Sequence, residues 1–391
     1  CPKIYGSIIV MKIKNAKLII RINSFFSAFL AAFFIAGCAS NLVGKYDSLT
    51  VIDGYKNIIL MIGDGMGENH IKVAEAYNQA QSSITNKALV RGYVTTASSS
   101  SPITDSAAGA TAMSTGEKVP NKAIAFKNGR KLTTMSEFAI AHEKGIGIIG
   151  TETVTGATMA AFSAHNPKRD NKDQIALEQY QSDIDVFIGA GKSYHDQKVE
   201  SISQFKREYF SDFSSLENHI SSIISGEKPV FSKVLAAFDS LSTLSSTPSS
   251  PTLSEAAILA LEYLEQEYEE EGFFALIEGS HIDKRAHDGD IFGMIDQLNG
   301  FDKAVDDVVE WARERDDTFV MVTADHETGG LKYHGEEKNE ISDEMFSISG
   351  HTAVDVPFYI YTIDNLSFIT DGDVIDNTDI AKLLRAMMRA S

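Results

Sequence analysis

Short, continuous apolar segments recur along the chain, and each ends at or beside Gly, Asp, Glu or Thr. A strand with one face in water alternates apolar and polar residues, whereas a strand buried on both faces is apolar throughout. These segments therefore predict the strands of a parallel sheet that helices cover on both faces. They are residues 57–63 (NIILMIG), 145–151 (GIGIIGT), 185–191 (DVFIGAG), 273–279 (FFALIEG), 319–324 (FVMVTA) and 357–362 (PFYIYT).

Helical patterns lie between these segments, at Leu253–Glu271 and Met294–Arg315. In the second, apolar residues recur every three or four positions, as on the buried face of a helix. Strands that alternate with helices predict an α/β fold with a doubly wound, mostly parallel central sheet flanked by helices. Ligands bind such sheets beyond the carboxyl ends of the strands, and Asp64, Glu278 and Asp325 fall there.

The first segment reads as an export signal rather than as part of the fold. Met11 begins a basic stretch, an apolar run follows at Phe25–Ala36, and Ile-Ala-Gly precedes Cys38. Basic, apolar and small residues in this order are typical of a signal peptide. The sequence Ile-Ala-Gly-Cys also resembles the lipobox of bacterial lipoproteins, although an ordinary signal with a chance cysteine is an open alternative.

We therefore expect residues 1–37 to be a signal peptide, and we interpret residues 1–10 as an artefact of the assigned translation start. Cys38 would carry the lipid, and residues 38–50 would link the lipid to a catalytic domain at 51–391. The protein would be exported to the periplasm or the cell surface and anchored there at Cys38.

The charge of the chain restricts its partners. The formal net charge is −19, so the surface repels nucleic acid and anionic lipid. We expect no nucleic-acid partner and membrane contact only through the lipid anchor. An acidic protein that binds phosphate must reverse its field locally, for which metal ions are suited. Both cysteines, Cys1 and Cys38, precede the expected catalytic domain, which therefore has no disulfides.

Residues 193–254 differ from the rest of the expected catalytic domain. The stretch is polar, and residues 240–254 are dense in Ser, Thr and Pro. Such composition is typical of exposed loops. We expect a surface insertion here.

Two motifs place reactive groups next to predicted elements. Asp64 lies in Gly-Asp-Gly after a strand, where it can reach a metal, although Asp-Gly alone more often marks an ordinary turn. Ser106 begins a run of small, helix-compatible residues, which Thr104 or Asp105 can cap. The Ser106 hydroxyl would then lie at the positive end of a helix dipole, a natural site for an anion. Because no Gly-x-Ser-x-Gly elbow is present, a metal is favoured over a histidine as its activator.

The remaining candidates have the side chains of metal ligands. Asp283 and His287 are four residues apart, so on a helical turn they share a face. Asp325 and His326 are adjacent at a strand end, and His351 precedes the last apolar segment. Mixed nitrogen and oxygen ligands suit zinc, and oxygen ligands alone suit magnesium.

In this order, the motifs from about residue 57 to 362 resemble the alkaline phosphatase family, in a bacterial form with a lipoprotein-type signal. The resemblance implies hydrolysis of phosphate monoesters to alcohol and inorganic phosphate through a covalent phosphoserine at Ser106. It also implies phosphate binding by Arg169 and a contact from Lys284 to phosphate through water. Since only residues 327–350 separate the motif at His326 from His351, we expect a reduced crown region.

The resemblance further implies two zinc ions and one magnesium ion. Carried over residue by residue, the first zinc would bind Asp283, His287 and His351. The second zinc would bind Asp64, Ser106, Asp325 and His326. The magnesium would bind Asp64, Thr158 and Glu278.

One position departs from the family pattern. Gly156 lies where relatives often carry an Asp or His that anchors water on the third metal. We therefore expect looser magnesium binding, unless His281 or Lys284 holds those waters.

Alternative functions are another metalloenzyme of the same superfamily, such as a phosphodiesterase, a sulfatase or a cofactor-independent phosphoglycerate mutase, or a lipoprotein that binds phosphate or metal without turnover. The resemblance leaves open the physiological substrate and whether the protein is a monomer or a homodimer.

Overall fold

The computed structural model describes residues 54–227, 233–241, 247, 249–362 and 369–390. The expected signal peptide (1–37), the linker (38–50) and Cys38 lie outside these residues, so those predictions stay predictions. Within the described ranges, no helix combines the length and apolarity needed to cross a membrane.

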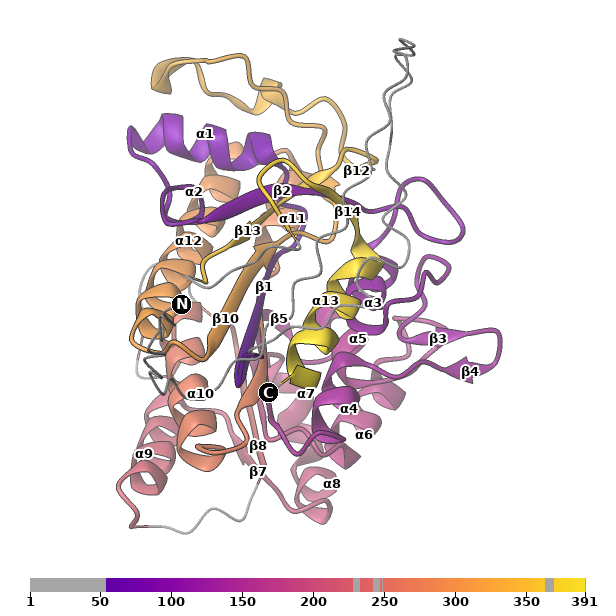
Figure 1. Ribbon diagram of the computed structural model, residues 1–391, viewed down its shortest axis with the longest axis vertical. Helices are drawn as coiled ribbons and strands as arrows, with labels where there is room; N and C mark the ends of the chain where they lie inside the picture. The colour runs from indigo at the N-terminus through magenta and orange to yellow at the C-terminus, as the bar shows by residue number, and fades with distance from the viewer. Residues whose placement is uncertain (1–53, 228–232, 242–246, 248, 363–368, 391) are drawn as a thin grey trace, which may run out of the picture. The chain divides into compact units, whose positions relative to one another are not determined.

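A ten-stranded sheet forms the centre of the described residues (Figure 1). Strand β1 lies near its middle and pairs in parallel with β9 on one side and β10 on the other. Strand β13 runs antiparallel to both of its neighbours, and the other pairings in this sheet are parallel. In order across the sheet, the strands are β14 (Val374–Asp376), β2 (Val90–Thr95), β13 (Val356–Ile360), β10 (Thr318–Thr323), β1 (Asn57–Gly63), β9 (Phe273–Gly279), β5 (Gly145–Thr153), β6 (Val186–Ala190), β8 (Lys233–Phe238) and β7 (Arg207–Phe210).

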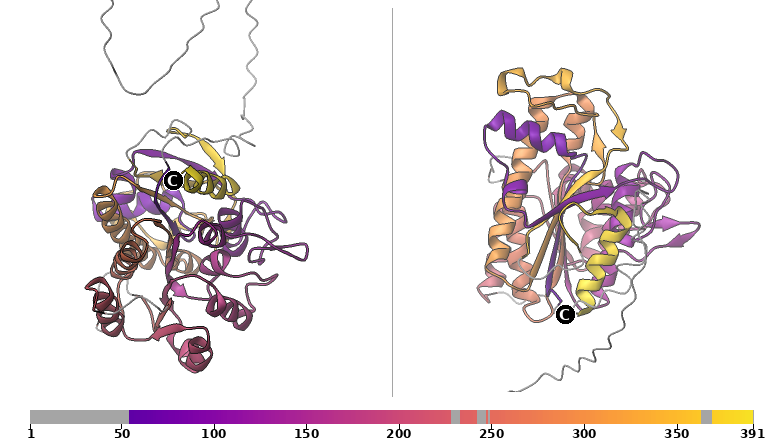
Figure 2. Two further views of the ribbon diagram at one scale, coloured as in Figure 1. Left: turned by 60° about the horizontal axis from the view of Figure 1, so that its bottom comes forward. Right: turned by 45° about the horizontal axis from the view of Figure 1, so that its top comes forward.

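Helices cover both faces of this sheet (Figures 1 and 2). On one face α10 packs against α9, α12 and β5, and on the other α3 packs against α5 and α13. The predicted doubly wound, mostly parallel α/β fold is thus confirmed. The helices are α1 (Glu68–Asn78), α2 (Ser83–Asn86), α3 (Ser106–Thr115), α4 (Met135–Ile140), α5 (Ala157–Ser163), α6 (Lys172–Gln181), α7 (Lys192–His195), α8 (Val199–Gln204), α9 (Phe213–Ile224), α10 (Leu253–Glu267), α11 (His281–Asp288), α12 (Ile291–Arg313) and α13 (Asn377–Ala390).

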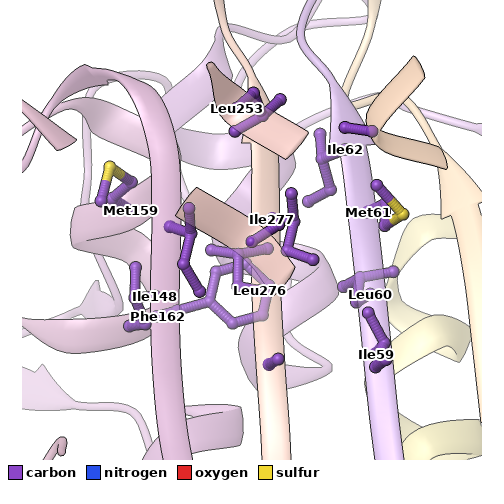
Figure 3. Close-up of a cluster of buried hydrophobic side chains, with 14 of the residues drawn as sticks. Ile59, Leu60, Met61, Ile62, Ile148, Met159, Phe162, Leu253, Leu276 and Ile277 are labelled. Carbon is purple, nitrogen blue, oxygen red and sulfur yellow. The ribbon is translucent and has the colours of Figure 1, made fainter. Parts of the chain in front are cut away.

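The apolar segments fill the core as their composition predicts. All residues of β1 and β9 are buried, because helices shield both faces of these central strands. Figure 3 shows Ile148 of β5 beside Met159 and Phe162 of α5, with Leu276 of β9 and then Leu60 of β1 farther across the sheet. Each of these side chains is fully buried. Helix α5, which carries Thr158, is therefore fixed to the sheet by apolar packing.

The expectation of a surface insertion at residues 193–254 is wrong in part. This stretch supplies β7 and β8, which extend the sheet beyond β6, and five of the six residues of β8 are buried. The short apolar run Val234–Phe238 was not recognised as a strand because polar residues surround it in the sequence. Its pairing with β6 buries it and gives it the character of a core strand.

Two small two-stranded sheets lie apart from the main one. Strand β3 (Phe126–Lys127) pairs with β4 (Arg130–Lys131), and β11 (Glu327–Thr328) pairs with β12 (His351–Thr352). Between β11 and β12, residues 329–350 hold only two short 3-10 helices and loops. This compact segment agrees with the expected reduction of the crown region.

Candidate metal centre and active site

Three carboxylates come together because three neighbouring parallel strands end at the same edge. Asp64 follows β1, Glu278 lies near the end of β9, and Asp325 follows β10. The backbone N–H of Asp64 donates to the carbonyl of Gly279 at 3.1 Å, which ties the ends of β1 and β9 together. All three side chains are buried. The site therefore lies where doubly wound sheets bind ligands.

A tight turn after β1 lets this edge close. Gly65 has a φ of +73°, and a Cβ there would lie 2.8 Å from Thr328 Oγ1 and 2.9 Å from Asp283 Cα. Its N–H donates to Asp325 Oδ1 at 3.2 Å, and the N–H of His326 donates to the same oxygen at 2.9 Å. One Asp325 oxygen is thus held by the backbone, which leaves Oδ2 directed at the site.

The serine motif forms a capped helix. The Asp105 side chain accepts from the N–H of Ala108 at 3.1 Å and caps α3, so of the two predicted capping residues the structure uses Asp105. Ser106 is the first residue of α3 and is buried. Its Oγ lies 3.3 Å from His326 Nε2. The hydroxyl is therefore both at the positive end of a helix dipole and beside the carboxylate cluster.

The first predicted zinc set converges on one point. Helix α11 places Asp283 and His287 on one face, and the pairing of β11 with β12 brings in His351. His287 Nε2 lies 3.0 Å from His351 Nε2 and 3.3 Å from Asp283 Oδ1. The other ring nitrogens donate to backbone carbonyls, His287 Nδ1 to Ser349 at 2.5 Å and His351 Nδ1 to Thr104 at 2.9 Å. Since each Nδ1 is taken up by a backbone carbonyl, the Nε2 atoms are the nitrogens left to bind a metal beside the Asp283 carboxylate.

The second predicted zinc set surrounds His326. Its Nε2 lies 3.2 Å from Asp325 Oδ2 and 3.5 Å from Asp64 Oδ1. Its Nδ1 lies 3.3 Å from Thr328 Oγ1, whose own proton goes to Asp283 Oδ1 at 2.5 Å. Thr328 therefore accepts from Nδ1, which leaves Nε2 unprotonated among carboxylates. These nitrogen and oxygen atoms are the ligand types that zinc binds.

The predicted magnesium ligands include buried oxygens without partners. Thr158 Oγ1 on α5 and Glu278 Oε2 on β9 have no hydrogen-bond partner among the described residues, and both side chains are 1% exposed. Leaving buried polar atoms unpaired costs about 1–3 kcal/mol each. A hard cation with oxygen ligands would satisfy both atoms.

Burial and mutual repulsion perturb these carboxylates. Burial, and then the charges of Asp325 and Asp283, raise the pKa of Asp64 well above its usual value. Burial and then Asp283 raise the pKa of Asp325 to about 6. Burial raises the pKa of Glu278 to about 8. Clustered carboxylates with raised pKa values are typical of functional sites, where a bound cation reverses the shift.

The histidines respond to the same surroundings in opposite directions. Burial lowers the pKa of His326 to about 4. The Asp283 carboxylate raises the pKa of the more exposed His287 to about 9. His326 is thus a neutral ligand at physiological pH, whereas His287 must exchange a proton for a metal.

The two predicted phosphate contacts lie differently. Arg169 Nη1 lies 3.2 Å from Asp105 Oδ2, and the N–H of Arg169 donates to the carbonyl of Lys122 at 2.8 Å. The guanidinium is therefore held beside the residue that caps α3. Lys284 instead forms an ion pair with Glu152.

Two residues of the site, Thr328 and Glu152, were not predicted from the sequence. Thr328 lies in the sequence Asp-His-Glu-Thr, close to the predicted ligands Asp325 and His326, and this proximity could have indicated it.

Taken together, the fold and these clusters define a class of protein, a doubly wound α/β protein with metal-binding residues beyond its strand ends. A sequence profile of the alkaline phosphatase family matches residues 55–209 and 227–348. The chain belongs to the alkaline phosphatase family.

Relatives in sequence and in structure carry the same family name. Alkaline phosphatase 4 of Bacillus subtilis (strain 168) is 33% identical over 313 residues, covering 75% of this chain and 66% of its own length. Alkaline phosphatase 3 of that strain is 32% identical over 299 residues, covering 71% and 62%. The chain thus spans slightly less than two thirds of these relatives.

Solved structures cover more of the chain. The alkaline phosphatase from the Antarctic bacterium TAB5 matches 87% of this chain and 100% of its own, with a TM-score of 0.72 and 29% identity. A variant of that enzyme with one histidine replaced by aspartate is described with magnesium bound in its M3 site.

The turn at Gly65 gives a testable prediction. Gly65→Ala should lower the free energy of unfolding by more than the matched control Gly226→Ala, measured by denaturant titration. Both residues have a φ of +73°, a conformation that costs an alanine about 1–2 kcal/mol. Only Gly65 adds a collision, with Thr328 and Asp283, since no atom of the described residues lies within 4 Å of a Cβ at Gly226. Equal losses would contradict the role of this turn in closing the site.

Proposed function

We propose that the protein hydrolyses phosphate monoesters to an alcohol and inorganic phosphate through a covalent phosphoserine at Ser106. The observation that carries this proposal is the Ser106 hydroxyl, buried at the N-terminus of α3 and 3.3 Å from His326 Nε2. Membership of the alkaline phosphatase family supports the same reaction class.

We further propose that the site holds two zinc ions and one magnesium ion. The residues fit these ions, since the Nε2 atom of each histidine lies beside a carboxylate and the third set offers oxygens alone. The magnesium described in the TAB5 variant supports a third, oxygen-lined site. When bound, such metals supply positive charge that lowers the pKa of a hydroxyl or a water and stabilises the negative charge of the transition state. The proposed sets are Asp283, His287 and His351; Asp64, Ser106, Asp325 and His326; and Asp64, Thr158 and Glu278.

The residues of the chain have separable roles in this reaction. Ser106 Oγ gives up its proton to solvent and forms a bond to phosphorus, while the bond from phosphorus to the ester oxygen breaks and that oxygen takes up a proton from solvent and leaves as the alcohol. The free N–H groups at the start of α3 stabilise charge on the transferred phosphoryl group. Water then attacks the phosphoserine, which releases phosphate and returns the hydroxyl of Ser106.

Arg169 favours monoesters over diesters in this proposal. A guanidinium can donate to two oxygens at once, and a monoester offers more charged, unesterified oxygens than a diester does. The contact between Arg169 Nη1 and Asp105 Oδ2 holds the guanidinium near the start of α3. Lys284, which pairs with Glu152, is the further candidate for a water-mediated phosphate contact.

A substitution at Ser106 tests the covalent step directly. Ser106→Ala should abolish the phosphoenzyme and lower turnover by several orders of magnitude, since the nucleophile is lost. Labelled substrate, quenched in acid and mapped by mass spectrometry, should mark Ser106 in the parent. The matched control is Ser114→Ala, which replaces a buried serine at the other end of α3. This variant should still be labelled at Ser106. Label on another residue of the parent would refute the assignment.

Arg169 is tested by a comparison of substrates. Arg169→Ala should weaken inhibition by phosphate and lower monoester kcat/KM by about 10–100-fold, since a hydrogen bond to a charged group contributes about 1.5–3 kcal/mol. The kcat/KM for a diester should fall less. Lys168→Ala, at the exposed neighbouring residue, is the control and should change neither. An equal fall for both substrates would mean that Arg169 does not select monoesters.

We also propose that the protein is exported and anchored by lipid at Cys38. The support is the order of basic, apolar and small residues that ends in Ile-Ala-Gly-Cys. Cys38→Ser should move the protein from the membrane pellet to the soluble fraction without loss of specific activity, because stable attachment needs the acyl chains that this residue would carry. A variant that still pelleted after a high-salt wash would place the anchor elsewhere.

A further inference from the structure

Strand β5 carries an irregularity close to the third predicted metal site. Ile149 pairs with Ile188 and Thr153 pairs with Ala190, so β5 has more residues than β6 between these two pairs. Such bulges redirect side chains and are frequent beside active sites. Glu152 lies within this bulge, and its N–H donates to Ser280 Oγ at 3.1 Å, two residues after Glu278 on the neighbouring strand.

The redirected Glu152 side chain occupies the space beside Gly156. A Cβ at Gly156 would collide with Glu152 Cγ and would lie 2.9 Å from the carbonyl oxygen of Thr153. Gly156 is the residue before α5, and Thr158 is the second residue of that helix. The volume that a larger side chain at 156 would need is therefore filled by the Cβ and Cγ atoms of Glu152.

The Glu152 carboxylate is both ionised and fixed. Oε1 accepts from the N–H of Thr153 at 3.0 Å, and Oε2 forms an ion pair with Lys284. Burial opposes ionisation, but the Lys284 ammonium outweighs it and lowers the pKa of the Glu152 carboxyl. The Glu152 side chain remains 25% exposed, so water can reach it.

The bulge also begins beside the unpartnered oxygens of this site. Gly150, two residues before Glu152, pairs with Glu278 in the neighbouring strand, and a Cβ at Gly150 would lie 3.2 Å from Glu278 Oε2. Glu278 Oε2 and Thr158 Oγ1 have no hydrogen-bond partner among the described residues. Two carboxylates near each other, with unpaired oxygens beside them, favour a divalent cation with bound water.

We propose that Glu152 is the outer carboxylate of the third metal site, where it orients metal-bound water and Lys284 in place of a side chain at position 156. The inference rests on the proposed function, because it assumes magnesium at Thr158 and Glu278. It reverses the expectation from the sequence that Gly156 leaves this metal loosely held. Glu152 is a positioning residue, since it acts on the metal through water.

Direct binding of magnesium tests the proposal. Glu152→Gln keeps the shape of the side chain and removes its charge, and it should weaken magnesium affinity about 10–100-fold, as losses of outer partners do. The measurement is calorimetric titration of Mg²⁺ into zinc-loaded, magnesium-free protein. The control is Glu178→Gln, which removes a glutamate of similar exposure, 23% against 25%, that pairs with Lys131 at 3.0 Å.

The outcomes separate this inference from the proposed function. Unchanged magnesium affinity in Glu152→Gln, with zinc content equal to that of the parent, would overturn the inference. A parent that hydrolyses monoesters but binds no magnesium would also overturn it and would leave the proposed reaction standing. A parent without zinc, phosphoenzyme or turnover would instead refute the proposed function.

A second pair of variants tests the shared volume. Gly156→Asp alone should bring no gain in magnesium affinity, because it displaces Glu152. In the background of Glu152→Ala, the same substitution should recover most of the lost affinity, after a small shift away from the Thr153 carbonyl. Such dependence on background is the signature of two residues that interact. An equal effect of Gly156→Asp in both backgrounds would show that the two positions act independently and would overturn the proposal.

Discussion

The crowding of carboxylates at the carboxyl edge of the sheet governs the rest of the site. The parallel register aligns the ends of β9, β1 and β10, so Glu278, Asp64 and Asp325 cannot avoid one another. Helix α11 adds Asp283 from above this edge. Buried like charges are costly unless protons or cations balance them. Without metal, raised pKa values show that protons would supply part of that balance. Metal binding and protonation therefore compete, and the affinity of this site must rise with pH.

Positive features at the site would allow a strongly acidic chain to bind the phosphate dianion of the proposed substrate. The net charge of −19 repels anions at long range, but screening restricts such fields to roughly 10 Å at ordinary ionic strength. At the site, the start of α3 and the Arg169 guanidinium are positive features that the chain itself provides. Asp105 joins them, since it caps α3 and also binds Arg169. One carboxylate thus positions both anion-binding elements, at the cost of weakening the free charge of the arginine.

The sequence predicted the parts of the site that local chemistry determines. The spacing of Asp283 and His287 required a helical turn, which α11 supplies, and buried apolar runs located β1 and β9 residue for residue. The position of His351 depends on the pairing of β11 with β12. Strands of two residues leave no pattern in the sequence that would predict this pairing. Strand β8 was missed because its apolar run is short and its polar neighbours dominated the reading. Strand β8 and the pairing of β11 with β12 were hard to predict for the same reason, since each element owes its conformation to partners far away in the chain.

Gly156 shows a different limit of reading residues by position. A motif comparison assigns each function to one sequence position, so a glycine at that position is interpreted as a missing side chain. A side chain from another position can, however, occupy the same volume in the structure. Glu152 lies in the bulge of β5, its Cβ and Cγ fill the volume beside Gly156, and its carboxylate pairs with Lys284. A larger residue at 156 and the observed conformer of Glu152 exclude each other sterically. In the proposed site, the glycine is therefore a condition for the position of Glu152 rather than a gap.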